Sequence, residues 1–286
     1  MRFGVTYANS GPGADPEHAV ALAHLAEEAG FDSLWTVEHA VIPAGFGSSY
    51  PYSRDGRLPG GEDVPIPDPL VWLAFVAAAT ARIRLATGIL ILPQRNPVLL
   101  AKETATLDVL SGGRLILGVG AGWLREEFDA LGVPWPDRGA RTEEYVMALR
   151  ALWTETEPTF SGRFLSFTKA KSYPKPVRPG GIPVVVGGHS EAAARRAGRV
   201  GDGFFPAVSD ADEVARLVGI ARASAREAGR DPDALEVTCG TPRDPDSVAR
   251  LADLGVARLT TSGVGEIDSL RAKFDRFRER VMDRVG

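Results

Sequence analysis

The chain is poor in the residues that build metal clusters and disulfide frameworks. It contains one cysteine, Cys239, and four histidines among 286 residues. A single thiol cannot form an intrachain disulfide, and the spacing of these few residues matches no zinc motif. Cys239 lies inside a predicted strand, where cysteine usually acts as a small apolar core residue. We therefore expect neither a metal centre nor a disulfide framework.

Long apolar runs and a strong net charge are missing as well. No apolar stretch is long enough to span a bilayer, and the chain opens directly on a predicted strand, without a basic and apolar leader. The 33 Lys and Arg residues nearly balance the 37 Asp and Glu residues, which gives a net charge of −4. Such a mild charge indicates no nucleic-acid partner and no anionic membrane. We expect a cytoplasmic protein that acts on a small-molecule substrate.

What the chain has in abundance is an alternation of apolar strands and helices. The clearest unit is a predicted strand over residues 83–92, a helix that begins at Pro97, a stop at Ser111-Gly112-Gly113, and a second strand over 114–119. Proline is well tolerated in a first helical turn, and glycine accepts the left-handed conformation that ends a helix. A strand–helix–strand unit places its two strands parallel, with a right-handed crossover.

The same alternation predicts eight strands. They cover residues 2–7, 33–38, 83–92, 114–119, 183–186, 203–206, 235–241 and 256–261. Helices are predicted over 16–29, 67–80, 97–110, 126–131, 141–154, 190–200, 210–228, 245–254 and 266–285. This pattern predicts an α/β fold with one domain over 1–286, a (β/α)8 or TIM barrel. The alternative is a doubly wound open sheet, but the first strand lacks the G-x-G-x-x-G turn of that fold.

Two segments interrupt the alternation. Residues 40–67 follow the second strand, are rich in Gly, Pro, Ser and Tyr, and show no helical or strand period. A loop of this length is usually a lid or a binding loop, and this one lies on the face where barrel enzymes build their sites. Residues 155–178 form a smaller insertion, in which we expect a hairpin near Phe160, with Phe164 and Phe167 packing on the barrel.

The carboxyl ends of the strands carry the candidate site residues. They are Glu38, His39, Gly88, Ile89, Gly120, Gly122, Trp123, Gly187, Gly188 and His189. Imidazole titrates near neutral pH, so His39 can accept or donate a proton. Small residues at strand ends leave room for a ligand against the backbone. Two glycines before a helix that starts near Ser190 can free backbone N–H groups for a phosphate, although an ordinary strand-to-helix turn would also explain them.

Three segments resemble a known family. Residues 30–39 (GFDSLWTVEH), 87–119 (TGILILPQRNPVLLAKETATLDVLSGGRLILGV) and 183–203 (PVVVGGHSEAAARRAGRVGDG) are similar to the bacterial luciferase-like monooxygenase superfamily. The continuation over 122–128 (GWLREEF) resembles the branch that depends on the deazaflavin coenzyme F420. The resemblance fades over the last third of the chain.

The resemblance implies how these residues would be used. The flavin or deazaflavin ring would lie at the carboxyl end of the barrel, against a bulge with a non-prolyl cis peptide at Gly88-Ile89. The turn at 187–190, with His189, would hold the cofactor phosphate, and His39 would lie close to the ring. Glu38 would contact the cofactor or orient a loop. Sugar-phosphate dehydrogenases of the superfamily carry a catalytic glutamate near position 123, whereas Trp123 offers only an apolar wall.

The resulting hypothesis is an F420-dependent oxidoreductase that transfers a hydride between reduced deazaflavin and a small organic substrate. The alternative within the superfamily is an FMN-dependent monooxygenase that uses oxygen. A non-catalytic flavin- or deazaflavin-binding protein is an alternative of another class. An aldolase or isomerase barrel would need a Schiff-base lysine or paired carboxylates, and the strand ends show neither. The family is often dimeric, and the helix over 67–80 is apolar nearly all round, so we expect a homodimer.

Overall fold

The parallel strands of the protein close into a barrel. The computed structural model describes residues 1–53, 55–242 and 244–285. In barrel order the strands are β1 (Arg2–Thr6), β2 (Ser33–Thr36), β3 (Arg84–Thr87) with β4 (Leu90–Ile91), β5 (Leu115–Gly120), β8 (Val184–Gly187), β9 (Gly203–Phe205), β10 (Glu236–Gly240) and β11 (Val256–Ser262). β11 pairs with β1 and β3 pairs with β5. The closed circuit confirms the predicted (β/α)8 barrel, and the alternative of an open sheet is wrong.

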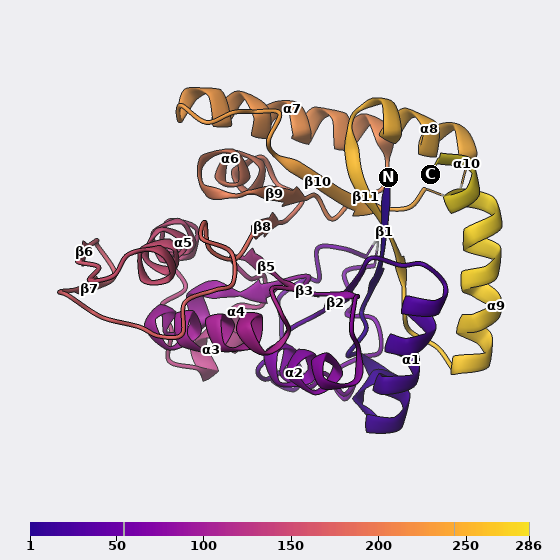
Figure 1. The fold of residues 1–286 in the computed structure, drawn as a ribbon, viewed down its shortest axis with the longest axis horizontal. Helices are drawn as coiled ribbons and strands as arrows, with labels where there is room; N and C mark the ends of the chain where they lie inside the picture. The colour runs from indigo at the N-terminus through magenta and orange to yellow at the C-terminus, as the bar shows by residue number, and fades with distance from the viewer. Residues whose placement is uncertain (54, 243, 286) are drawn as a thin grey trace.

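Helices surround these strands (Figure 1). They are α1 (Pro16–Glu28), α2 (Pro69–Ala79), α3 (Pro97–Leu110), α4 (Arg125–Ala130), α5 (Arg138–Thr154), α6 (Glu191–Val200), α7 (Ala211–Glu227), α8 (Pro245–Asp253), α9 (Ile267–Phe277) and α10 (Asp283–Val285). α1, α2 and α8 each begin with an Asp-Pro pair, in which the aspartate side chain accepts a hydrogen bond from a free N–H of the first turn. The predicted last helix is wrong in one respect, because a π-helical turn at Arg278–Met282 separates α9 from α10.

The third barrel strand is broken in its middle. β3 ends at Thr87, the Gly88-Ile89 peptide bond is cis, and β4 resumes at Leu90. β4 pairs with β5, so the barrel wall continues after the break. The predicted strand over 83–92 is therefore divided at Gly88-Ile89, where the family resemblance implied a bulge with a cis peptide.

An ion cluster fills the amino end of the barrel. The guanidinium of Arg258 is fully buried; its Nη2 lies 2.8 Å from Asp32 and its Nη1 lies 2.6 Å from Glu236. Above it the Trp35 ring packs with its centroid 5.5 Å from the Arg258 Cζ atom. Trp35 belongs to the apolar cluster inside the barrel, against which Phe205 packs. Charged and aromatic side chains thus occupy the interior at the amino end of the barrel.

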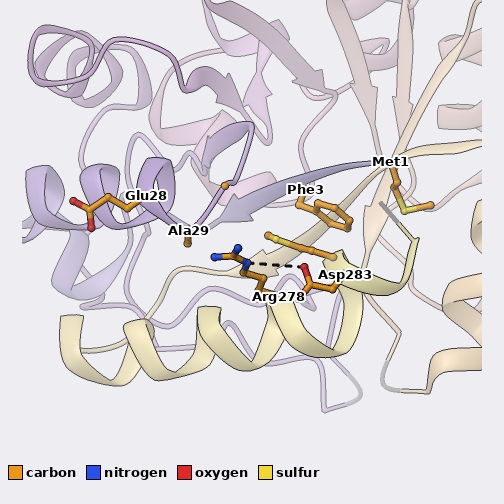
Figure 2. Close-up of a pocket in the computed structure, with 8 residues that line it drawn as sticks. Met1, Phe3, Glu28, Ala29, Arg278 and Asp283 are labelled. Carbon is orange, nitrogen blue, oxygen red and sulfur yellow. Dashed lines mark ion pairs between the residues drawn. The ribbon is translucent and has the colours of Figure 1, made fainter.

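Two further features lie at the periphery of the barrel. The insertion forms an antiparallel hairpin of β6 (Phe160–Ser161) and β7 (Ser166–Phe167), which lies beside α5 in Figure 1. Phe167 packs against the core as expected, but Phe164 lies in the turn, where the Arg141 and Arg163 guanidinium groups cover its ring. A cavity of about 350 Å³ lies near both chain ends, and Figure 2 shows the side chains that line it. Its lining residues are Met1, Phe3, Glu28, Ala29, Gly30, Arg278, Met282 and Asp283.

Candidate functional site

His39 is the titratable side chain at the centre of the carboxyl end. It follows β2, its side chain is 8% exposed, and its Nδ1 atom lies 3.1 Å from Oε2 of Glu127 on α4. The other oxygen of Glu127 accepts hydrogen bonds from the backbone N–H groups of Ala40 (2.6 Å) and Val41 (3.3 Å). Glu127 is fully buried, and sequence reasoning missed it. It lies on one face of the α4 region with Leu124 and Phe128, both buried, and a glutamate on such an apolar face is the one signal that could have indicated it.

Glu38, the neighbour of His39, is directed toward the broken strand. Its carboxylate accepts hydrogen bonds from the backbone N–H of Ile91 and from Arg95, whose Nε lies 2.8 Å from Oε1. Arg95 also pairs with Asp68 at 2.6 Å, at the start of α2. Burial raises the pKa of Glu38, although Arg95 and the Ile91 N–H act in the opposite direction. Both oxygens are therefore engaged by protein groups, which favours a role in orienting the segment after the cis peptide.

Trp123 forms the centre of an aromatic cluster between the barrel and the long loop. Its ring packs edge-on against His39 (5.6 Å between centroids), Phe46 (5.7 Å) and Tyr50 (5.2 Å). Tyr52 in turn packs 5.0 Å from the ring of His189. Burial is the main cause that raises the pKa of both tyrosines, so their phenols stay neutral at physiological pH. The loop thus lies over the carboxyl end and connects His39 with His189 through aromatic contacts.

Polar side chains fix the loop over 40–67 at its two ends and also at Gly47 and Ser48. Asn9 is fully buried. Its amide group donates to the carbonyl oxygen of Val37 and accepts from the Val37 N–H, and it also donates to the carbonyl oxygen of Pro67 at 2.9 Å. Glu126 accepts hydrogen bonds from the backbone N–H of Gly47 (2.8 Å) and from the Ser48 hydroxyl (2.7 Å). Apart from Arg54, which lies outside the described residues, the segment 40–67 contains neither helix nor strand. The predicted loop therefore lies over the carboxyl end of the barrel in a defined conformation, and the side chains that hold it were not among the residues selected from the sequence.

The glycines at the strand ends accommodate protein side chains. A Cβ at Gly120 would lie 2.6 Å from Cδ1 of Ile89, and a Cβ at Gly187 would lie 2.4 Å from its Cγ2. A Cβ at Gly122 would lie 2.7 Å from the Phe128 ring. We expected these glycines to leave space for a ligand, but neighbouring side chains fill the space beside each of them. Contact of a cofactor with their backbone stays a prediction.

The turn after β8 leads from a glycine with positive φ into a capped helix start. Gly188 has φ of +131°, and Ser190 caps α6 by accepting a hydrogen bond from the Ala193 N–H at 3.2 Å. The first N–H groups of a helix are free to bind an anion, and the helix dipole favours one. The structure brings His39 against Trp123 and Tyr52 against His189, whereas Gly88 of the cis peptide lies beside Trp35 and Phe205. Among the described residues no group of three or more His, Cys, Asp and Glu side chains could hold a metal ion.

Comparison with known proteins places this geometry in context. Residues 1–243 match the model of the luciferase-like monooxygenase family. An uncharacterised protein of Mycobacterium tuberculosis is 38% identical over 262 residues, which cover 91% of this chain and 90% of that protein. The F420-dependent glucose-6-phosphate dehydrogenase of Nakamurella multipartita is 34% identical, over 82% of this chain and 65% of that enzyme.

A solved structure shows the same fold. The coenzyme F420-dependent tetrahydromethanopterin reductase from Methanopyrus kandleri superposes with a TM-score of 0.79, at 17% sequence identity, over 100% of this chain and 99% of that one. No described helix of the present chain has both the length and the apolar character needed to cross a membrane.

Proposed function

The chain belongs to the luciferase-like monooxygenase family, and from this premise we propose that it is an F420-dependent oxidoreductase acting on a small organic substrate. A hydride would pass between the reduced deazaflavin and the substrate. The observation that carries the proposal is the position of His39. It lies at the carboxyl end of the barrel, against Trp123, and is held there by the buried carboxylate of Glu127. A histidine so placed can move the proton that accompanies a hydride.

The residues of the site fit a deazaflavin. A flat aromatic ring suits the apolar wall of Trp123, Phe46 and Tyr50, and Gly188 leaves the backbone at the start of α6 open to a phosphate. A Cβ at position 188 would lie 2.9 Å from Ala193, so a side chain there would crowd this helix start. When bound, the deazaflavin would supply the ring carbon that gives or takes the hydride. The protein would orient the substrate, exclude water with the loop over 40–67, and move the proton at His39.

The relatives support F420 more directly than FMN. The similar enzyme of Nakamurella multipartita is named as F420-dependent. In the present chain, Trp123 argues against sugar-phosphate dehydrogenation, because tryptophan cannot act as the base that a glutamate near this position would supply. The second candidate is an FMN-dependent monooxygenase that uses oxygen, which the name of the matching family favours. A binding protein without turnover is the third reading.

A titration of the purified apoprotein with F420 and with FMN, followed by ring fluorescence, tests the proposal. Saturable binding of F420 with little binding of FMN supports it, and a screen of enones, imines and quinones then seeks the substrate. Preference for FMN overturns it in favour of the monooxygenase. Binding of F420 without turnover of any substrate supports the third reading, and binding of neither cofactor contradicts all three.

We also propose that the protein works as a homodimer. Val71 and Phe75 on α2 are 70% and 49% exposed, and Leu99 and Leu110 on α3 are 63% and 77% exposed. Large apolar side chains that gather on neighbouring outer helices are typical of an interface. Sedimentation velocity over a concentration series tests this. A dimer that Phe75→Glu converts to a monomer is expected, and a monomer at every concentration of the wild type would overturn the proposal.

A further inference from the structure

The buried carboxylate of Glu127 has two backbone N–H groups and one ring nitrogen directed at it. Oε1 accepts from the backbone N–H groups of Ala40 and Val41, at 2.6 and 3.3 Å. Oε2 lies 3.1 Å from Nδ1 of His39. An ionised carboxylate can only accept hydrogen bonds. With an ionised Glu127, the contact with His39 requires a proton on Nδ1.

The proton on Nδ1 determines what the other ring nitrogen can do. A neutral imidazole carries one proton, so Nε2 is then an acceptor with a free lone pair. No described residue donates a hydrogen bond to Nε2 of His39, and this atom is not among the buried polar atoms that lack a partner. Nε2 lies on the edge of the ring that faces away from the buried carboxylate. It is the nitrogen left to meet a ligand.

We infer that Glu127 is a positioning residue, which holds His39 in the Nδ1–H tautomer and so makes Nε2 a proton acceptor. Its catalytic use rests on the proposed function, in which His39 moves the proton. The arrangement follows the general rule that a carboxylate behind a functional histidine sets both the ring orientation and the tautomer. Glu127 also bonds to Ala40 and Val41, so the same carboxylate holds the backbone that follows His39.

The substitution Glu127→Gln provides a sharp test, because the local hydrogen bonds dictate how the amide must lie. Ala40 and Val41 both donate at the position of Oε1, so the amide oxygen takes that position. The NH2 group then lies at the position of Oε2, facing Nδ1, and a donor there requires an unprotonated Nδ1. The proton moves to Nε2, and the tautomer of His39 is reversed without a change in side-chain size.

Glu126→Gln is the matched control. Glu126 lies on the same turn of α4 and also holds loop backbone, at Gly47 and Ser48, but its described hydrogen bonds do not include His39. The chemical change is the same in both variants. Any effect of a missing charge on α4 or of a looser loop would appear in Glu126→Gln as well.

The measurement is a two-dimensional proton–nitrogen spectrum of the histidine rings, recorded on 15N-histidine-labelled apoprotein above the titration range of histidine. The chain has only four histidines, and His39→Gln identifies the signals of His39. We expect the Nδ1–H pattern in the wild type and in Glu126→Gln, and the Nε2–H pattern in Glu127→Gln. An Nε2–H pattern in the wild type would overturn the inference even if the variant failed to fold. An unchanged pattern in Glu127→Gln, or the same change in both variants, would also overturn it.

A kinetic comparison separates this inference from the proposed function. With F420 and a substrate, Glu127→Gln should lower kcat by about the same factor as His39→Gln, with little change in KM, while Glu126→Gln, which alters only the contact with Gly47 and Ser48, should lower kcat by a smaller factor. Full turnover by His39→Gln would overturn the role of His39 in the proposed function. The assignment of Glu127 as the residue that sets the tautomer would still stand on the spectra of the apoprotein.

Discussion

The side chain of Ile89 occupies the space that a side chain at Gly187 would need. A Cβ at position 187 would lie 2.4 Å from Cγ2 of Ile89. The first residue after the cis peptide therefore packs against the end of a strand on the opposite side of β5. This contact makes the two positions energetically dependent on each other.

Gly187→Ala should lower the free energy of unfolding by about 1–3 kcal/mol, because the added methyl group overpacks a filled site. Urea unfolding measures this. Ile89→Ala removes Cγ2, so the double variant should lose less than the sum of the two single losses. Gly219→Ala on α7 is the control, since nothing lies within 4 Å of its added Cβ. Additive losses would contradict the predicted contact.

Arg258→Met should be among the most damaging substitutions in the chain. It leaves Asp32 and Glu236 facing each other at the amino end of the barrel without the buried guanidinium that pairs with both. Removing one partner of a buried ion pair costs about 3–5 kcal/mol. Arg271→Met is the control, because Arg271 is exposed and lies 3.8 Å from its carboxylate partner. Equal unfolding free energies of the two variants in urea would show that the cluster contributes little.

The same cluster predicts a pH dependence. Burial by itself would raise the pKa of Glu236, but Arg258 and Arg2 outweigh it and hold the pKa below its ordinary value of 4.5. The folded protein then releases this proton more readily than the unfolded chain does, so the stabilisation is present above pH 4.5 and is lost as the pH falls below it. The difference in unfolding free energy between the wild type and Glu236→Gln should be largest at neutral pH and shrink on acidification. A difference that stays constant from pH 7 to about pH 3 would contradict the depressed pKa.

Glu126→Ala should loosen one part of the loop without loosening its start. The carboxylate of Glu126 holds the N–H groups of Gly47 and Ser48, whereas that of Glu127 holds the N–H of Ala40. Hydrogen exchange should therefore accelerate at Gly47 and Ser48 and stay at the wild-type rate at Ala40. Acceleration at all three amides would indicate that the loop opens as a single unit.

His39→Gln should lower kcat by about 10²–10⁴-fold if His39 moves the proton in the chemical step. Binding of F420 should be kept, because glutamine can occupy the same space and donate to Glu127. His24→Gln on α1 is the control, since His24 is exposed and contacts only the backbone oxygen of Ala79 through its ring. Fluorescence titration and initial rates measured side by side distinguish loss of chemistry from loss of binding.

The barrel could be predicted from the sequence because each strand–helix unit carries its own local signals. The Asp-Pro starts of α1, α2 and α8 and the glycines after α3 mark helix ends whatever the rest of the chain does. The break in the third strand has a weaker local signal, a single glycine at position 88 within an apolar strand. Residues 83–92 are almost wholly apolar, and only the family resemblance indicated the cis peptide at Gly88.

The site was predicted less completely, because its contacts join residues far apart in the sequence. His39 follows directly from the end of a strand, but Glu127 is 88 positions away and Arg95 is 57 positions from Glu38. Spacing along a strand also cannot show which side chain fills the space beside Gly187. The residue types at the strand ends could therefore be identified from the sequence, whereas their contact partners could be identified only from the folded barrel.

The adjacent glutamates on α4 have a consequence for protein engineering. Glu127 and Glu126 bind different parts of the segment over 40–48, and Trp123 just before them packs on Phe46 and Tyr50. A loop transplanted from a relative into this barrel would therefore arrive without its own anchors. An exchange of residues 40–67 should therefore include residues 123–128, and Asn9, which holds Val37 and Pro67, should be kept.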